Sequence, residues 1–173
     1  MTKITPTTKQ RTARVITVLL TWILSAAAYA DNHTTEQADM PHPYIFHLIQ
    51  ADLWQAAVDS DQMYYPPTYE QDGFTHGTAN PNLLLNVANH FYQEVPGEWL
   101  CLRMTVDSLK QGGVEVVFEG TAPVGDKQPD FPGTDDELFP HILGGIPPAA
   151  VLDVHQVIRT GDGGFVSIEG VTD

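Results

Sequence analysis

Three histidines stand in sequence contexts that could support chemistry. His47 lies inside an apolar and aromatic run, His76 ends the segment Gly-Phe-Thr-His, and His141 ends Phe-Pro-His. An imidazole titrates near neutral pH, so it can transfer a proton, ligate a metal or bond to a hydroxyl group. A buried imidazole also needs partners for its ring nitrogens, so each histidine could equally be held by the backbone for structural reasons alone. If the three converge in space, a shared site becomes the better explanation.

Convergence of these histidines would permit three kinds of site. A zinc site with three histidines and a water is the first, but the spacings match no recognised metal motif and include no His-x-x-x-His pair. We therefore expect no metal. General acid–base catalysis is the second kind, and hydrogen bonding to the hydroxyls of a ribose or another sugar is the third. The residue types alone leave these two open.

Other reactive motifs are poorly supported. No Gly-x-Ser-x-Gly elbow is present, and Cys101 lies in the apolar run Trp-Leu-Cys-Leu, which is typical of a buried and inert thiol. The glycine-rich residues 161–164 precede an apolar strand-like run, which favours a hairpin turn over a phosphate-binding loop. Tyr64, Tyr65 and Tyr69 could stack on a flat ligand ring, or could pack at the rim of the core.

Most of the elements that must position these residues are predicted strands. Short or alternating apolar runs predict strands over 44–49, 99–106, 114–119, 151–159 and 165–168. Along the first of them, alternation places His47 on the face that carries Ile45 and Ile49. Helical spacing predicts one helix over 51–60 and a second after Asn80, a natural N-cap that is followed by Pro81.

The segment over 120–138 is rich in Pro, Gly and Asp, so we expect a long loop there. Strands predominate and the two helices come early, which predicts an α+β fold with antiparallel sheet.

The first 30 residues are expected to be a secretory signal peptide. Four basic residues precede the apolar run 15–28, and Ala-Tyr-Ala at 28–30 is a typical cleavage site. The run is shorter than the roughly 20 residues of a spanning helix, so we expect no stable membrane anchor after cleavage behind Ala30. The predicted organisation is a signal peptide over 1–30, a flexible tail over 31–43 and a single globular domain over 44–173, located in the periplasm or secreted.

The composition narrows the function classes further. The chain of 173 residues has 22 acidic and 8 basic residues and a net charge of −14. An acidic protein with so few cations has the wrong sign for phosphate contacts, so we expect no nucleic-acid binding. A hydrophobic share of 42% can build a core, and a single cysteine excludes an internal disulfide framework.

Four segments resemble the bacterial Domain of Unknown Function 952 family. In order they are IFHLIQADLWQAA, YYPPTYEQDGFTH, ANHFY and FPHI, and the resemblance extends over residues 44–170. It implies an ADP-ribosyltransferase-like α+β fold, similar to tRNA 2′-phosphotransferases, with two small antiparallel sheets around a cleft and two N-terminal helices. It also implies that His47 stands where related transferases carry a histidine that hydrogen-bonds a ribose of NAD. His76 and His141 match the family's second and third histidine contexts, and Glu119 falls where the family tends to carry a glutamate.

Two main hypotheses about function follow. In the first, the protein is an exported transferase or hydrolase of the ADP-ribosyl type that acts on NAD or a related nucleoside. His47, His76 and Glu119 would then be catalytic, and His141 and Tyr65 would bind the ligand. In the second, the same cleft is a non-catalytic module for a small neutral or weakly anionic ligand. A third hypothesis, an acidic interaction protein, would require histidines that are scattered in space. NAD would be a substrate, no bound cofactor is expected, and the sequence leaves turnover and any protein partner open.

Overall fold

The computed structural model describes residues 42–129 and 131–173. The signal peptide predicted over 1–30, and the predicted tail up to residue 41, lie outside the described residues. The described elements are β1 (Ile45–Gln50), α3 (Ala51–Ser60), α4 (Tyr69–Asp72), β2 (Thr75–His76), the 3-10 turn η1 (Pro81–Leu83), α5 (Leu84–Tyr92), β3 (Trp99–Met104), α6 (Val106–Gln111), β4 (Val116–Glu119), β5 (Phe139–Ile142), the 3-10 turn η2 (Pro148–Ala150), β6 (Asp153–Arg159) and β7 (Phe165–Ile168). None of the helices in these ranges has the length and apolar character needed to cross a bilayer.

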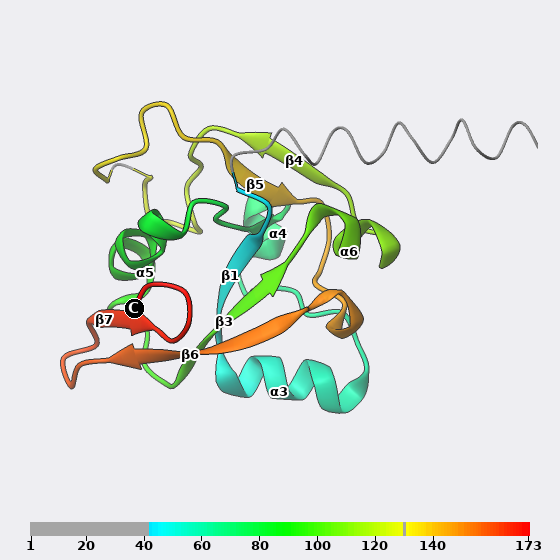
Figure 1. Cartoon of the computed structure of the whole chain (residues 1–173), viewed down its shortest axis with the longest axis horizontal. Coiled ribbons are helices and arrows are strands. Elements are labelled where there is room, and N and C mark those ends of the chain that lie inside the picture. The colour runs from blue at the N-terminus through cyan, green and yellow to red at the C-terminus, as the bar shows by residue number, and fades with distance from the viewer. Residues whose placement is uncertain (1–41, 130) are drawn as a thin grey trace, which may run out of the picture. The chain divides into compact units, whose positions relative to one another are not determined.

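The strands form two antiparallel sheets (Figure 1). The first has four strands in the order β1-β3-β6-β7, and the second has three strands in the order β2-β5-β4. The α+β class with two antiparallel sheets is therefore confirmed. The sheets meet at β1, where the backbone of Phe46 exchanges hydrogen bonds of 2.8 and 2.9 Å with Thr78, just beyond β2. This junction brings the first strand close to the segment that carries His76.

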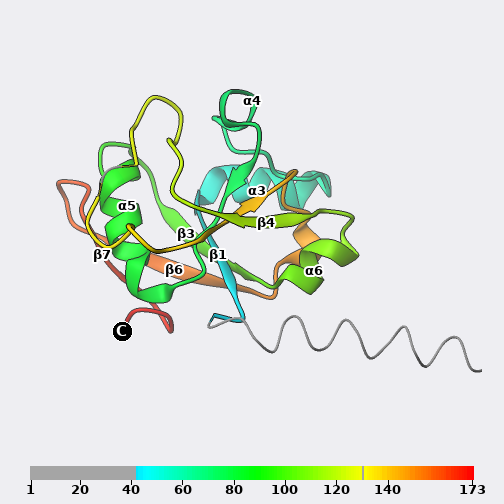
Figure 2. The same cartoon turned by 90° about the horizontal axis from the view of Figure 1, so that it is seen from above.

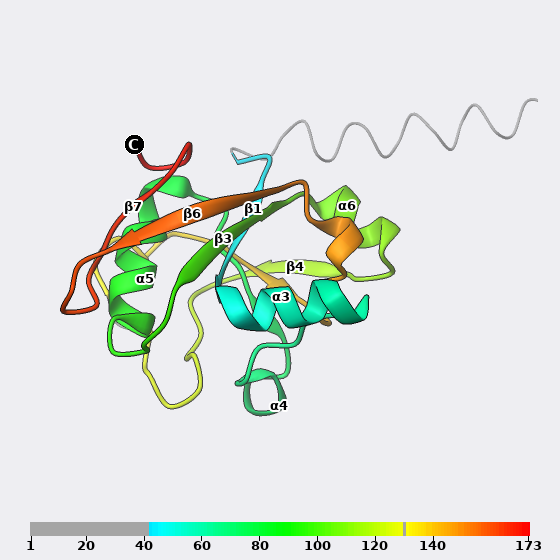
Figure 3. The same ribbon diagram turned by 90° about the horizontal axis from the view of Figure 1, so that it is seen from below.

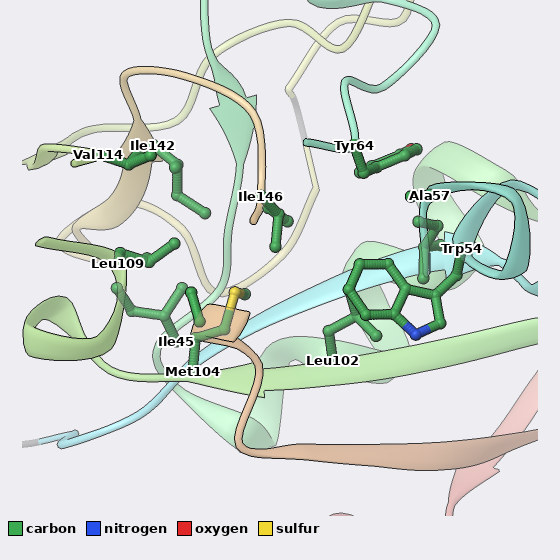
Figure 4. Close-up of a cluster of buried hydrophobic side chains, with 12 residues drawn as sticks. Ile45, Trp54, Ala57, Tyr64, Leu102, Met104, Leu109, Val114, Ile142 and Ile146 are labelled. Carbon is green, nitrogen blue, oxygen red and sulfur yellow. The ribbon is translucent and has the colours of Figure 1, made fainter. Parts of the chain in front are cut away.

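Each face of β1 and β3 packs against its own apolar cluster. On one face, Leu84 and Ala88 of α5 pack with Trp99 and Cys101. On the other face, α3, α6 and β5 contribute to a cluster that contains Leu102 (Figures 3 and 4). Because side chains alternate along a strand, β1 supplies Phe46 and Leu48 to the first cluster and Ile45 and Ile49 to the second.

Several predicted elements form over the predicted residues, and others differ for local reasons. The helix over 51–60 and the strand over 165–168 match α3 and β7. Asn80 caps as predicted, since its side chain accepts from the backbone N–H of Asn82 at 3.1 Å, but the helix begins as the 3-10 turn η1. The strand predicted over 99–106 ends at Met104, because Thr105 and Ser108 form a reciprocal capping box that starts α6.

The long loop over 120–138 connects β4 to β5 and contains a short bridge between Val124 and Lys127. Its first part, residues 120–129, passes between α4 and α5 (Figure 2). Strand β5, which follows it, was not predicted. It is the central strand of its sheet and contains Pro140, a residue that normally argues against a central strand.

Candidate functional site

His47, His76 and His141 line one cavity. His47 comes from β1 of the four-stranded sheet, whereas His76 and His141 come from β2 and β5 of the three-stranded sheet. The cavity measures about 30 Å³, which is room for about two water molecules. Thr78 and Thr121 are among the lining residues, and no Lys, Arg, Asp or Glu is among the described residues that line it. The structure therefore gathers the three imidazoles in a site without lining charges.

The strand register explains why two of the histidines meet. His76 and His141 are direct cross-strand partners in the antiparallel pair β2–β5, and their ring centroids lie 6.0 Å apart. Phe74 stacks on the ring of His141 with centroids 3.9 Å apart and planes at 19°, and it also lies 4.5 Å from the ring of His76. Cross-strand neighbours share one face of a sheet, so the two imidazoles lie side by side.

His47 is tied to the second sheet by a hydrogen bond. Its Nδ1 lies 2.7 Å from the backbone oxygen of His76, and a carbonyl oxygen can only accept, so Nδ1–H donates. The lone pair of the neutral ring is then on Nε2, which is buried and has no partner in the described part of the chain. Burial lowers the pKa of His47 from its ordinary value near 6.5 to about 4. His47 is therefore a neutral imidazole with a spare acceptor.

Gly77 allows the two sheets to approach this closely. A Cβ atom at this position would lie 3.0 Å from Cγ2 of Ile45 and 3.0 Å from the ring and carbonyl oxygen of Pro140. The backbone N–H of Gly77 donates to that same carbonyl oxygen at 2.9 Å. A residue with a side chain would push β1 away from β5, and with it His47 away from His76 and His141.

A buried carboxylate orients His76. Its Nε2 lies 3.0 Å from Oδ2 of Asp72, whose side chain is only 4% exposed. An ionised carboxylate only accepts, so Nε2 carries the proton and the lone pair of the neutral ring is on Nδ1. Burial lowers the pKa of His76, and the nearby His141 lowers it further, whereas the carboxylate of Asp72 opposes both. Asp72 was not predicted as a site residue.

His141 has a carboxylate partner of its own. Its Nδ1 lies 3.0 Å from Oε2 of Glu119. The register of β4 and β5 pairs Val117 with His141, so Glu119 is the diagonal neighbour on the same face. This bond makes Nδ1 the donor and leaves Nε2 as the acceptor. Glu119 itself is 64% exposed at its side chain and is not among the residues that line the cavity.

The arrangement thus presents three imidazoles whose protein partners leave one lone-pair nitrogen on each ring. Such nitrogens accept hydrogen bonds from hydroxyl or amino groups, and they can take up a proton during a reaction. No cluster of three His, Cys, Asp or Glu side chains placed to hold a metal ion occurs within 42–129 and 131–173.

The family model described as "Protein of unknown function (DUF952)" matches residues 48–154 of the chain. The protein belongs to the DUF952 family. The matched range contains His76, Glu119 and His141, while His47 directly precedes it.

Among solved structures, the DUF952 chain is similar to protein CC0527 from Caulobacter crescentus, with 16% sequence identity and a TM-score of 0.54. The similarity covers 71% of this chain and 93% of that chain, and a double mutant of CC0527 gives the same values. At this identity the likeness shows a shared fold. No curated protein matches the chain.

The tyrosines of this DUF952 domain differ in their exposure and in whether they line the cavity. Tyr65, which the sequence suggested as a ligand-binding residue, is 50% exposed, packs its ring 4.8 Å from Tyr69 and is not among the cavity residues. Its neighbour Tyr64 is buried, with its ring 5.6 Å from that of His47. Tyr92 of α5, which was not predicted, lines the cavity, and burial raises the pKa of its phenol. Helix α5 therefore supplies two of the aromatic side chains of the lining, Phe91 and Tyr92.

Proposed function

We propose that this DUF952 domain binds a small neutral ligand of the nucleoside type in the histidine-lined cavity and acts on its glycosidic bond, as a transferase or hydrolase of the ADP-ribosyl type. The observation that carries the proposal is the set of three converging imidazoles, His47, His76 and His141, each with an acceptor nitrogen that its protein partners leave open. A ribose presents hydroxyl donors, which are the complement of such acceptors.

The walls of the cavity support the choice of a flat, uncharged ligand. Phe91, Tyr92 and Phe131 supply aromatic surface against which a base can pack. No arginine or lysine lines the cavity within the described residues, so a pyrophosphate would have no cationic partner there. A nucleoside therefore fits the lining better than intact NAD, the substrate suggested by the family resemblance.

The pair of His76 and Asp72 supports a chemical role. In hydrolysis, the bond between C1′ and the base breaks, and the oxygen of water bonds to C1′. Nδ1 of His76 would take the proton from that water and pass it to the leaving base, so that the ring ends neutral as it began. Asp72 would stabilise the imidazolium formed between these two transfers. His47 would hold a ribose hydroxyl through Nε2.

A second candidate function is ligand binding without turnover. Glu119, the expected stabiliser of an oxocarbenium-like centre, is mostly exposed and bonds to His141 instead of lining the cavity. A domain that lacks a carboxylate at the cavity wall would retain recognition and have little means to break the bond.

The experiment combines thermal shift with product analysis. We expect adenosine, guanosine, cytidine or uridine to raise the melting temperature more than NAD does, and His47→Gln and His76→Gln to abolish that rise. Release of free base, followed by chromatography, supports the enzyme, whereas stabilisation without base release supports the binding module. If neither these nucleosides nor NAD nor free ribose raises the melting temperature, both proposed functions are overturned.

We also propose kinship with ADP-ribosyltransferase-like folds and export from the cytoplasm. Two antiparallel sheets around a histidine-lined cavity support the kinship. The charged start, apolar centre and Ala-Tyr-Ala end of the leader support cleavage behind Ala30 and a mature protein in the periplasm or medium. N-terminal sequencing of the exported protein tests this, and a cytosolic protein that keeps residues 1–30 would refute it.

We further propose that the mature protein does not bind nucleic acid, because only four basic residues follow the leader. Binding to RNA that weakens steeply with added salt would contradict this.

A further inference from the structure

A short segment of the chain closes the cavity on one side. Residues 120–129, here called the lid segment, follow β4 and contribute Thr121, Ala122 and Val124 to the lining. In this closed arrangement the cavity measures about 30 Å³, whereas pockets that hold drug-sized molecules measure about 300 Å³ or more. A nucleoside therefore requires part of the cavity wall to move, and the lid segment is a part of that wall outside the helices and strands.

The lid segment is fastened to α4 and α5, between which it runs in Figure 2. Three of the contacts are exposed. Nε2 of Gln71 donates to Asp126 at 3.0 Å, and Nε2 of His90 lies 2.7 Å from the backbone oxygen of Gln128. Nζ of Lys127 donates to Glu94 at 3.3 Å. One contact is partly buried: the backbone N–H of Gly125 donates to both carboxylate oxygens of Asp72, at 3.0 and 3.2 Å. Asp72 is the residue that also holds His76, so a single carboxylate joins the lid segment to the imidazole.

The backbone at Gly125 is suited to this contact. Its φ of +56° lies in the left-handed region, and a Cβ atom there would come within 3.1 Å of Cγ2 of Thr68. A side chain at this position would strain the turn and press against α4. Glycine thus allows the lid backbone to reach the carboxylate.

We infer that Asp72 is a positioning residue that couples closure of the lid segment to the protonation state of His76, so that the cavity is closed when His76 is neutral and opens when His76 takes up a proton. The inference rests on the proposed function in one respect: a nucleoside ligand is the reason for the lid segment to open. The coupling between the lid segment and His76 requires no ligand.

The electrostatics of the closed state explain the direction. The titratable groups that face His76 are Asp72 from α4, His141 from β5 and His47 from β1. The phenol of Tyr92 from α5 lines the same cavity, and the charge of Asp72 raises its pKa. In the closed state His76 is desolvated, and an N–H donor already engages the carboxylate that would balance a charge on its ring. A proton on His76 would also repel one on His141. Opening the lid segment rehydrates His76, so protonation favours the open state.

Two substitutions separate the lid contact from the imidazole contact. Gly125→Ala displaces the lid segment and leaves Asp72 bonded to His76. Asp72→Asn removes the charge that acts on both. Glu70→Gln is the matched control, because it removes a charge from an exposed residue of the same helix. Histidine titration by NMR reports the pKa of His76, and amide hydrogen exchange reports opening of residues 121–128.

We expect Gly125→Ala to speed exchange in the lid segment by about tenfold or more and to raise the pKa of His76 as water enters. Asp72→Asn should also speed exchange but should lower the pKa of His76, because the stabilising charge is lost. Glu70→Gln should change neither. In the native chain, the protection of the Gly125 amide against hydrogen exchange, corrected for the intrinsic exchange rate, should fall as the pH drops through the titration midpoint of His76. His76→Gln should remove that pH dependence.

The inference is overturned if lid protection is independent of pH, or if Gly125→Ala opens the segment and leaves the pKa of His76 unchanged. If a variant loses its native circular dichroism, the pH dependence in the native chain and in His76→Gln still decides. Because none of these measurements includes a ligand, their failure is distinct from a failure of nucleosides to bind.

Discussion

Two buried regions meet along β1, and they are filled in different ways. The cluster around Leu102 is apolar throughout, with Ile45, Ile49 and Met104 each at most 1% exposed. In the cavity, His47 and His141 are also buried, each 4% exposed, but the buried Nε2 of His47 has no partner in the described part of the chain.

The difference supports the proposal that the apolar cluster maintains the fold and that the cavity binds a ligand. His47 occupies the same face of β1 as Ile45 and Ile49, where an apolar residue would serve packing alone. A buried polar group without a partner destabilises a fold by about 1–3 kcal/mol. We therefore propose that a ligand supplies the missing partner of Nε2 of His47.

Substitution in the apolar cluster should have the largest effect on stability. Leu102 is fully buried, so Leu102→Ala should lower the free energy of unfolding by about 4 kcal/mol through lost burial and a residual cavity. Denaturant unfolding measures it, with Leu152→Ala, at a position that is 51% exposed, as the control. Similar losses of stability in the two variants would contradict the assignment of this cluster to the core that maintains the fold.

The second effect is a pH dependence that arises in the cavity. The folded pKa of His47 lies at about 4, below the ordinary value near 6.5 that it has when unfolded. Its contribution to stability is therefore fully present above pH 6.5 and is lost as the pH falls toward 4, by about 3 kcal/mol in total. Unfolding at neutral pH and at about pH 4 should show a smaller difference for His47→Gln than for the native chain. Equal differences would place the acid sensitivity elsewhere.

The third effect should separate binding from stability. His141→Gln keeps a polar side chain but removes the imidazole acceptor and its stacking on Phe74. We expect nucleoside affinity to fall about tenfold, which corresponds to about 1.4 kcal/mol, with a change in unfolding free energy below about 1 kcal/mol. Calorimetric titration and denaturant unfolding of the same sample check both. A variant that loses stability and keeps affinity would assign His141 to the fold alone.

The smallest effect on stability is expected at Glu119. Its carboxylate is mostly solvent-exposed, so Glu119→Gln should change the free energy of unfolding by no more than about 0.5 kcal/mol. If Glu119 acts through His141 in a reaction, base release should slow while nucleoside affinity stays constant. Equal rates in the native and variant chains would remove Glu119 from the catalytic residues and favour the binding module.

Local patterns in the sequence determined much of the fold. Helical spacing defines α3, alternation defines most of β3, and Asn80 with Pro81 marks the start of the second helical segment. These features depend on residues that are close in the chain, so period and capping chemistry suffice to predict them. The residue types of the three histidines likewise marked them as candidates.

The contacts that make the site depend on distant parts of the chain. Strand β5 exists because β2 and β4 pair with it on both sides, in spite of Pro140. The bond between Gly125 and Asp72 joins residues 53 positions apart, and the same strand pairing that brings Glu119 to His141 leaves it outside the cavity lining. Tyr65 and Tyr64 are neighbours in sequence, yet only Tyr64 is buried. No local period encodes these pairings, because strand register and packing between sheets are decided by the whole chain at once.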